Sequence, residues 1–320
     1  MWKRVCVSSA ELTASAGPVA APDRKPRIGL SDARRRAAIV LAACRPRQWS
    51  KNLLLLAAPT AGGVVDDASD IGRVTLAIAA FCLLSSATYL VNDVRDREQD
   101  RHHPTKRARP VASGALAPRS ALCVAALLCL AGLGIGLALR WQFALLGVGY
   151  LALTTSYSLW WRRVIGLDIL AIAAGFVIRA AAGGAAVDVG LSRWFLLVTS
   201  CGAVFVVAAK RYAELREEHH AGALRHSLGG YSLGMLRAVI ALAGSGAAGA
   251  YILWVSTRPA DGPWYELTIM PVALWLGRYA VLVARGGGEA PEELILGDRP
   301  LLAVTLVWVL LFVGAIYVGG

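Results

Sequence analysis

The residues best suited to chemistry lie in one acidic segment, residues 89–100, with the sequence YLVNDVRDREQD. On a helix, Asn92, Asp96 and Asp100 are spaced i, i+4 and i+8, so they would share one face with Asp93 beside them. Mg²⁺ prefers oxygen ligands and usually combines one or two carboxylates with substrate phosphates and water. The spacing therefore predicts Asn92, Asp96 and Asp100 as ligands of a magnesium ion that carries a diphosphate. The alternative is a solvated helix end whose acidic side chains pair with neighbouring arginines.

A cationic segment follows directly, at residues 101–110, with the sequence RHHPTKRARP. Its prolines prevent one long helix, so we expect a lid over the acidic segment. Lys106 and Arg107 could neutralise the charge that builds on a diphosphate leaving group, and we assign catalysis to Lys106 together with Asp93 and Asp96. The alternative is that these cations only set the orientation in a membrane. Zinc is disfavoured, because the two adjacent histidines would point in different directions and no partner stands at zinc spacing.

Further cations stand near the ends of apolar stretches, namely Lys51, Arg162, Arg163 and Lys210. Each could bind a phosphate, or could serve as an anchor whose charged end reaches the membrane surface. Arg179 differs because it interrupts an apolar stretch, and a charge at membrane depth is a candidate for a functional site. Asp168, eleven residues earlier and on a similar face, is the structural partner that we expect for Arg179.

The elements that must position these residues are membrane helices. The chain is 57% hydrophobic and only 17% charged, whereas soluble domains carry roughly 25% charged residues. Apolar stretches near the length of about 20 residues that a spanning helix needs recur along the sequence. They predict an all-α, polytopic membrane protein of about nine transmembrane helices, at residues 50–66, 74–92, 119–139, 141–161, 164–186, 194–210, 234–256, 264–284 and 300–318.

The distribution of Lys and Arg predicts how the chain is oriented and divided. The connections rich in these residues alternate with nearly neutral ones, which predicts a cytoplasmic N-terminus and an outer C-terminus. Two long polar connections, residues 93–118 and 211–233, should cap the cytoplasmic face. Residues 1–42 read as a basic cytoplasmic tail and residues 43–320 as the membrane domain. The net charge of +12 sits in short connections, which argues against nucleic acid as a partner.

The pattern Asn92-Asp93-x-x-Asp96-x-x-x-Asp100 at the end of the second expected span resembles the UbiA superfamily of intramembrane prenyltransferases, over roughly residues 43–318. Four blocks in order resemble, more narrowly, the decaprenyl-phosphate phosphoribosyltransferase family: RPRQWxKN at 45–52, YLVNDVRD at 89–96, HPTKRxRP at 103–110 and KRYAEL at 210–215. The resemblance implies Mg²⁺-dependent transfer of 5-phosphoribose from 5-phosphoribosyl 1-diphosphate to decaprenyl phosphate. It also implies a plasma-membrane enzyme on the route to the lipid-linked arabinose donor of cell-wall arabinan, with homo-oligomers plausible.

Carried over by position, the resemblance places Mg²⁺ on Asn92 and Asp96. It places the phosphates and ribose of the donor against Lys51, Tyr89, Lys106, Arg162 and Arg179, and the lipid phosphate against Lys210. The family commonly has Lys where Arg162 aligns, and Arg163 leaves the register open by one residue.

Two other functions remain open on the sequence. A UbiA-type prenyltransferase acting on an aromatic or other acceptor would carry a second acidic motif, but residues 162–168 offer only Asp168. The surplus of cations favours the phosphoribosyl donor and the phosphorylated acceptor, which carry more phosphates. A transporter would place ionisable residues deep in several spans, whereas the charges here lie near the ends of the spans.

Overall fold

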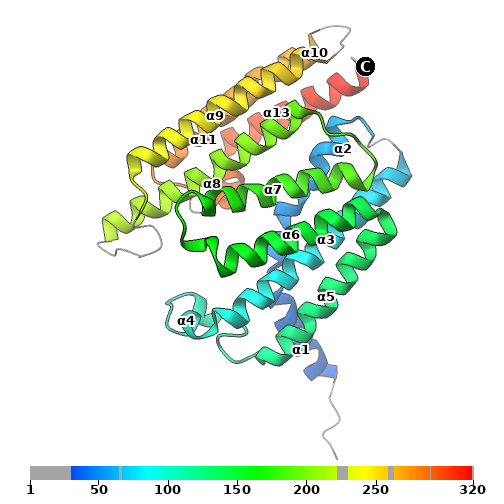
Figure 1. Cartoon of the computed structure of the whole chain (residues 1–320). Coiled ribbons are helices and arrows are strands. Elements are labelled where there is room, and N and C mark those ends of the chain that lie inside the picture. The colour runs from blue at the N-terminus through cyan, green and yellow to red at the C-terminus, as the bar shows by residue number, and fades with distance from the viewer. Residues whose placement is uncertain (1–29, 65–66, 222–229, 259–262, 289, 319–320) are drawn as a thin grey trace, which may run out of the picture. The chain divides into compact units, whose positions relative to one another are not determined.

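The computed structural model describes residues 30–64, 67–221, 230–258, 263–288 and 290–318, and this part of the chain contains helices and no strand (Figure 1). The prediction of an all-α fold is therefore confirmed. The helices are α1 (Leu30–Ala43), η1 (Pro46–Leu56), α2 (Ala57–Ala61), α3 (Ala68–Arg95), α4 (Arg97–Arg101), η2 (Lys106–Ala108), α5 (Pro118–Leu139), α6 (Trp141–Leu159), η3 (Trp161–Arg163), α7 (Leu167–Ala186), α8 (Arg193–Ala221), α9 (Leu233–Ser256), α10 (Trp264–Leu267), α11 (Ile269–Ala284), α12 (Pro291–Gly297) and α13 (Arg299–Val318).

The chain divides into two units, Met1–Ala38 and Ile39–Gly320. Most of the tail predicted at residues 1–42 lies outside the described residues, so that assignment stays a prediction. All the predicted site residues belong to the second unit.

Seven helical segments in the described residues are long and apolar enough to cross a membrane, formed by α3, α5, α7, α8, α9, α10 with α11, and α13. The predicted count of nine is not confirmed. The expected span at 50–66 is the 11-residue 3₁₀ helix η1 followed by the five-residue α2. The expected span at 141–161 is the 19-residue α6, whose last turns carry Thr154, Thr155, Ser156 and Ser158 and so lower its hydropathy.

The interior near the site is packed from α3, α6, α7 and η1. Phe81 of α3 lies edge-on to Phe143 and tilted against Tyr150, with ring centroids 5.6 and 5.5 Å apart. Gly183 of α7 touches the backbone of η1, because a Cβ atom at this position would lie 1.8 Å from the Leu55 carbonyl oxygen. The missing side chain therefore lets η1 lie directly against α7, which brings Asn52 of η1 into the interior.

A second core joins α8, α9 and α11. Phe205 and Tyr279 lie with ring centroids 5.6 Å apart, and Tyr279 stacks on Trp275 at 5.2 Å. Gly244 of α9 faces Phe205, because a Cβ atom at this position would lie 3.2 Å from the ring. This packing holds α8 against α9 and α11.

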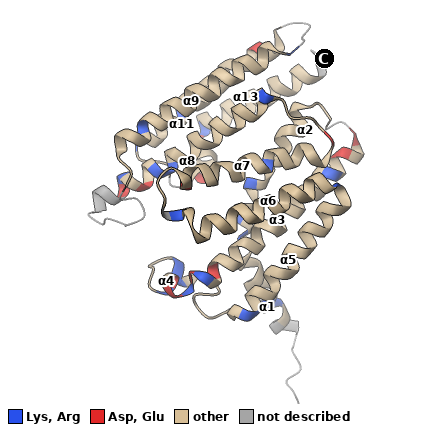
Figure 2. Cartoon of the chain, in the orientation of Figure 1, with Lys and Arg blue, Asp and Glu red and all other residues tan. Residues whose placement is uncertain are grey.

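The two long connections are more helical than expected. Residues 93–118 contain α4 and η2, and α8 continues through Ala221, although the sequence pattern predicts a loop from residue 211. Lys210 and Glu214 pair across one turn of α8, with 3.8 Å between Nζ and Oε1, and such pairs support a helix. Figure 2 shows Lys and Arg at α4, at the connection between α6 and α7, and at the adjoining ends of α8 and α9.

Candidate functional site

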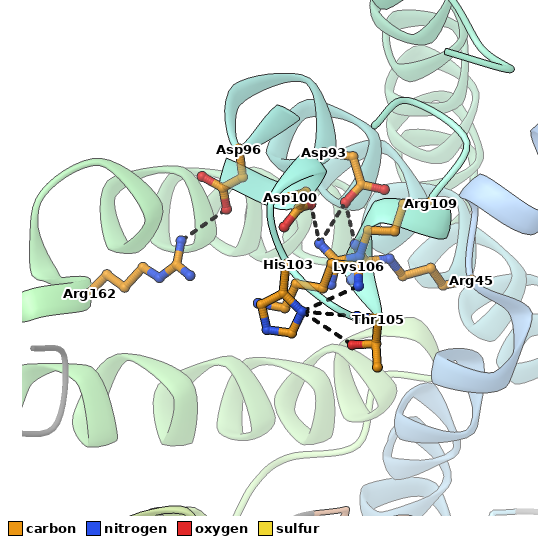
Figure 3. A network of polar contacts seen from close by, with 9 residues as sticks. All are labelled: Arg45, Asp93, Asp96, Asp100, His103, Thr105, Lys106, Arg109 and Arg162. Carbon is orange, nitrogen blue, oxygen red and sulfur yellow. Dashed lines mark hydrogen bonds and ion pairs between the residues drawn. The ribbon is translucent and has the colours of Figure 1, made fainter. Parts of the chain in front are cut away.

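The acidic segment is held by arginines from three other segments, Arg45, Arg109 and Arg162 (Figure 3). Asp93, near the end of α3, is 2% exposed and forms an ion pair with Arg45. Nη1 of Arg109, from the predicted lid, lies 3.3 Å from Asp93 Oδ1 and 2.6 Å from Asp100 Oδ2. The cationic segment therefore folds back onto the acidic one, and Arg109 fastens it there.

The helical spacing of the acidic residues is kept across the break between α3 and α4, but Asp96 and Asp100 bind different arginines. α3 ends at Arg95 and α4 begins at Arg97, while backbone hydrogen bonds of 2.8 Å still join Asp96 N to Asn92 O and Asp100 N to Asp96 O. Asp100 faces Arg109, whereas Asp96 accepts a hydrogen bond of 2.9 Å from Arg162 Nη1. Asn92 lines a groove between α3, α5 and α6.

The oxygens of this segment suit a hard divalent cation. Oδ2 of Asp93 is buried without a hydrogen-bond partner among the described residues. The Asp96 carboxylate is only partly buried, and Asn92 adds an amide oxygen. No three His, Cys, Asp or Glu side chains gather into a ready metal cluster in the described ranges, so a bound cation would draw further ligands from phosphate and water. The donor set fits Mg²⁺, and the assignment of Asn92, Asp96 and Asp100 as ligands stays a prediction.

The cations predicted near this segment come from two connections. Arg162 lies in η3 and reaches Asp96, while the side chain of Arg163 falls outside the described part. Lys106 and Arg107 lie in η2; Lys106 is partly buried and Arg107 is exposed. The backbone N–H of Lys106 donates a hydrogen bond of 3.4 Å to His103 Nδ1, within the turn formed by residues 103–106.

Arg179 is buried, and its partners differ from the predicted one. Its Nε donates to Asn52 Oδ1 at 2.9 Å, and its Nη2 donates to the Tyr150 hydroxyl at 3.0 Å. The expected pairing with Asp168 is wrong, because Asp168 lies at the start of α7 and binds Arg211 Nε at 2.9 Å. The close approach of η1 to α7 supplies Asn52 in place of a carboxylate.

Two predicted donor-binding residues, Tyr89 and Lys51, lie near this buried arginine. Tyr89 of α3 lies beneath Arg45, whose guanidinium carbon is 5.0 Å from the ring centroid, and Tyr89 is also close enough to Arg179 to interact with its charge. Lys51 of η1 similarly interacts with the charges of Arg179 and Lys210. Tyr89 thus connects the acidic segment to a second cationic group, formed by Lys51, Arg179 and Lys210.

Two carboxylates near the predicted site residues, Glu292 and Glu214, were not predicted from the sequence. Glu292 of α12 lies 3.7 Å from Lys51 Nζ and accepts a hydrogen bond of 3.2 Å from Gln48 Nε2. Glu214 of α8 binds Arg211 Nη1 at 2.6 Å, so Arg211 joins Glu214 to Asp168. The acidic pair at residues 292–293 was visible in the sequence, but nothing local connected it to Lys51.

Two residues at this end of the bundle have shifted pKa values with clear causes. Burial alone would raise the pKa of Glu292, but its backbone hydrogen bond, the charge of Lys51 and the Gln48 amide bring the pKa below its usual value. Burial, followed by the hydrogen bond to Asp168, raises the pKa of Tyr231 to about 12. Glu292 is therefore ionised and Tyr231 protonated at neutral pH.

The apolar helices, with charged residues gathered near their ends, are those of an integral membrane protein. The chain belongs to the UbiA prenyltransferase family, whose model matches residues 53–297. It is 41% identical over 293 residues to a decaprenyl-phosphate phosphoribosyltransferase of Mycolicibacterium smegmatis, covering 87% of this chain and 92% of the relative. A protein of the same name from Corynebacterium glutamicum is 40% identical over 289 residues, 87% of each chain.

A solved structure has the same fold. A UbiA homologue from Archaeoglobus fulgidus, bound to GPP and Mg²⁺, superposes with a TM-score of 0.67, covering 87% of this chain and 99% of the homologue at 15% identity. At this identity the similarity concerns the fold alone.

Proposed function

We propose that this chain transfers 5-phosphoribose from 5-phosphoribosyl 1-diphosphate to decaprenyl phosphate and releases diphosphate. The observation that carries the proposal is the similarity to relatives with this activity in their names, which extends over 87% of the chain at about 40% identity. The geometry supports it, because cations surround two places rather than one. The Asp93–Asp100 segment has Arg45, Arg109 and Arg162, and the second cationic group consists of Lys51, Arg179 and Lys210.

In this proposal, the acidic segment and its lid hold the leaving group. Asn92, Asp96 and Asp100 would bind Mg²⁺, which would draw electron density from the diphosphate. Lys106 with Arg107, and Arg162 or Arg163, stabilise the charge that builds on the diphosphate as the bond to C1 breaks. Asp93 acts in catalysis by holding Arg45 and Arg109 at the leaving group.

The second group would hold the rest of the two substrates. Lys51, Tyr89 and Arg179 meet the phosphoribosyl part of the donor, and Lys210 meets the phosphate of the lipid. The acceptor oxygen is already an anion at neutral pH, so it can attack C1 without a general base. Attack opposite to the leaving group inverts C1 and gives a β-linked product.

The second candidate is transfer of a prenyl group to an aromatic or other acceptor, the activity that the family name describes. The carboxylates Asp168 and Glu214 favour it, because they lie together at the same end of the bundle. Both are bound by Arg211, however, which leaves less negative charge for a second metal-bound diphosphate.

We place the active site and the N-terminus on the cytoplasmic side of the plasma membrane. The connections rich in Lys and Arg support this orientation. The reaction would supply the lipid-linked arabinose donor for cell-wall arabinan, and a homo-oligomer is part of the proposal.

The test uses the purified full-length protein in detergent with Mg²⁺, decaprenyl phosphate and labelled 5-phosphoribosyl 1-diphosphate. We expect label in the lipid phase for the wild type and its loss in Asp96→Ala. Failure of the wild type to transfer this label, together with transfer from a prenyl diphosphate, would establish the second candidate instead.

A further inference from the structure

Glu292 brings a negative charge into a group of cations, which is unexpected at a site for phosphates. Its carboxylate lies 3.7 Å from Lys51 Nζ, and it also interacts with the charge of Lys210. Glu292 lies next to Lys51, and Tyr89 interacts with the charges of Glu292, Arg45 and Arg179, so Glu292 lies close to predicted donor-binding residues.

The chain before α12 fixes Glu292 in this place. Gly286 and Gly288 have φ values of +109° and +115°, a region that favours glycine. Gly288 packs on α8, since a Cβ atom here would lie 3.4 Å from Ala213 Cβ and 3.1 Å from Val283 Cγ2. After α12, Asp298 accepts a hydrogen bond of 2.9 Å from Leu301 N and binds Arg278 at 2.8 Å. The segment before α12 therefore packs on α8, and the residue after α12 is held by Arg278.

The hydrogen-bonding capacity around Glu292 is incompletely used. The contact with Lys51 is longer than a hydrogen bond, and the donors to the carboxylate are the Gln48 amide at 3.2 Å and the backbone N–H of Glu292. Tyr279, which also interacts with the charge of Glu292, has a buried hydroxyl without a hydrogen-bond partner among the described residues. An ionised carboxylate accepts up to about four hydrogen bonds, so Glu292 retains acceptor sites for a ligand.

A carboxylate accepts hydrogen bonds, so it can bind only those parts of the substrate that carry N–H or O–H groups. Phosphates are anions and would be repelled, and a polyprenyl phosphate offers no hydroxyl outside its phosphate. Hydroxyl groups on a sugar ring are the donors that suit Glu292.

We propose that Glu292 accepts hydrogen bonds from the ring hydroxyls of the pentose and so makes the site specific for a sugar diphosphate over a prenyl diphosphate. The inference rests on the proposed function and adds a specificity residue to it. In the bound state Lys51 turns to a donor phosphate, while Gln48 keeps the carboxylate oriented.

The experiment compares 5-phosphoribosyl 1-diphosphate with its 2-deoxy counterpart as donors for the full-length protein in detergent. The variants are Glu292→Gln, Glu292→Asp and, as the matched control, Glu293→Gln, whose side chain lies next in the same helix. The wild type and Glu293→Gln should favour the ribose donor by about tenfold or more, because a hydrogen bond to a charged group is lost with the 2-hydroxyl. Glu292→Gln should raise KM for the ribose donor roughly tenfold and bring the ratio of kcat/KM for the two donors near one. Glu292→Asp should recover part of this ratio.

The outcomes separate the inference from the proposed function. Equal losses with both donors in Glu292→Gln, leaving the ratio of the wild type, would overturn the inference and leave the function intact. A lower KM in Glu292→Gln would also overturn it, since the carboxylate would then compete with phosphate. Absence of transfer from either sugar donor by the wild type would refute the proposed function, and the inference with it.

Discussion

Arg179 of α7 donates a hydrogen bond of 2.9 Å to Asn52 of η1, and so connects a membrane helix to the 3₁₀ segment that carries Lys51. Both residues are buried, and Tyr150 supplies another partner for the guanidinium. This contact holds η1 against α7. It therefore helps to fix the position of Lys51, the predicted donor-binding residue next to Asn52.

Replacing Arg179 by Lys should lower both stability and activity. Lysine keeps the charge but cannot bind Asn52, Tyr150 and the Gly175 carbonyl with a fixed planar group. Hydrogen bonds of charged groups contribute about 1.5–3 kcal/mol each, so we expect a clear fall in Tm and roughly a tenfold or greater loss of transfer. Arg193→Lys, at the exposed start of α8, is the control and should retain both. An unchanged Tm in Arg179→Lys would contradict the role of this contact.

Asp93→Asn and Asp96→Asn should fail in different ways. Asp93 is buried between Arg45 and Arg109, so its loss leaves Arg45 without its ion pair and Arg109 with Asp100 alone, and should destabilise the protein by about 3 kcal/mol. Asp96 is partly exposed, so Asp96→Asn should keep Tm but require more Mg²⁺ for half-maximal activity. Magnesium titrations and thermal unfolding of both variants would check this, and equal effects on Tm would argue against it.

Gly183→Ala should separate η1 from α7. The added Cβ would meet the Leu55 carbonyl oxygen at 1.8 Å, and this backbone atom cannot turn aside as a side chain can. We expect a lower Tm and a higher KM for the donor, because Lys51 and Asn52 move with η1. Gly202→Ala, on α8 with no atom within 4 Å of the added Cβ, is the control. It should be neutral or stabilising by about 1 kcal/mol, the usual advantage of Ala in a helix.

Removal of divalent cations should stop transfer but leave the fold intact. Arg109 and Arg162 already neutralise Asp100 and Asp96 in the protein alone, so no carboxylate cluster in the described residues depends on a metal for its counter-charge. A chelator should abolish activity reversibly, with recovery on adding Mg²⁺ and little change in Tm. A large fall in Tm with the chelator would mean that the metal is part of the folded structure.

Local patterns predicted the seven apolar helical segments of the described residues, because their apolar length marks them in the sequence, but also two further spans that are not among the seven, and they did not predict the contacts between distant segments. Arg179 could be recognised in the sequence as a charge in an apolar stretch. Its partner Asn52 could not, because Asn52 reaches Arg179 only where Gly183 lets η1 pack directly on α7. Gln48 and Glu292 are 244 positions apart in the sequence, so only the fold shows that α12 returns to η1. The extension of α8 to Ala221 was missed because its last turns are polar, although side-chain pairs such as Lys210 with Glu214 support them.

Arg109 holds two carboxylates at once, and this bears on the order in which ligands arrive. A free cation that binds Asp100 alone would have to displace the guanidinium from Asp100 and leave it only the longer contact with Asp93. A cation that arrives already bound to its anionic substrate offers the released arginine a phosphate in exchange. We therefore expect metal and donor to bind synergistically, each tightening the other, rather than as independent events.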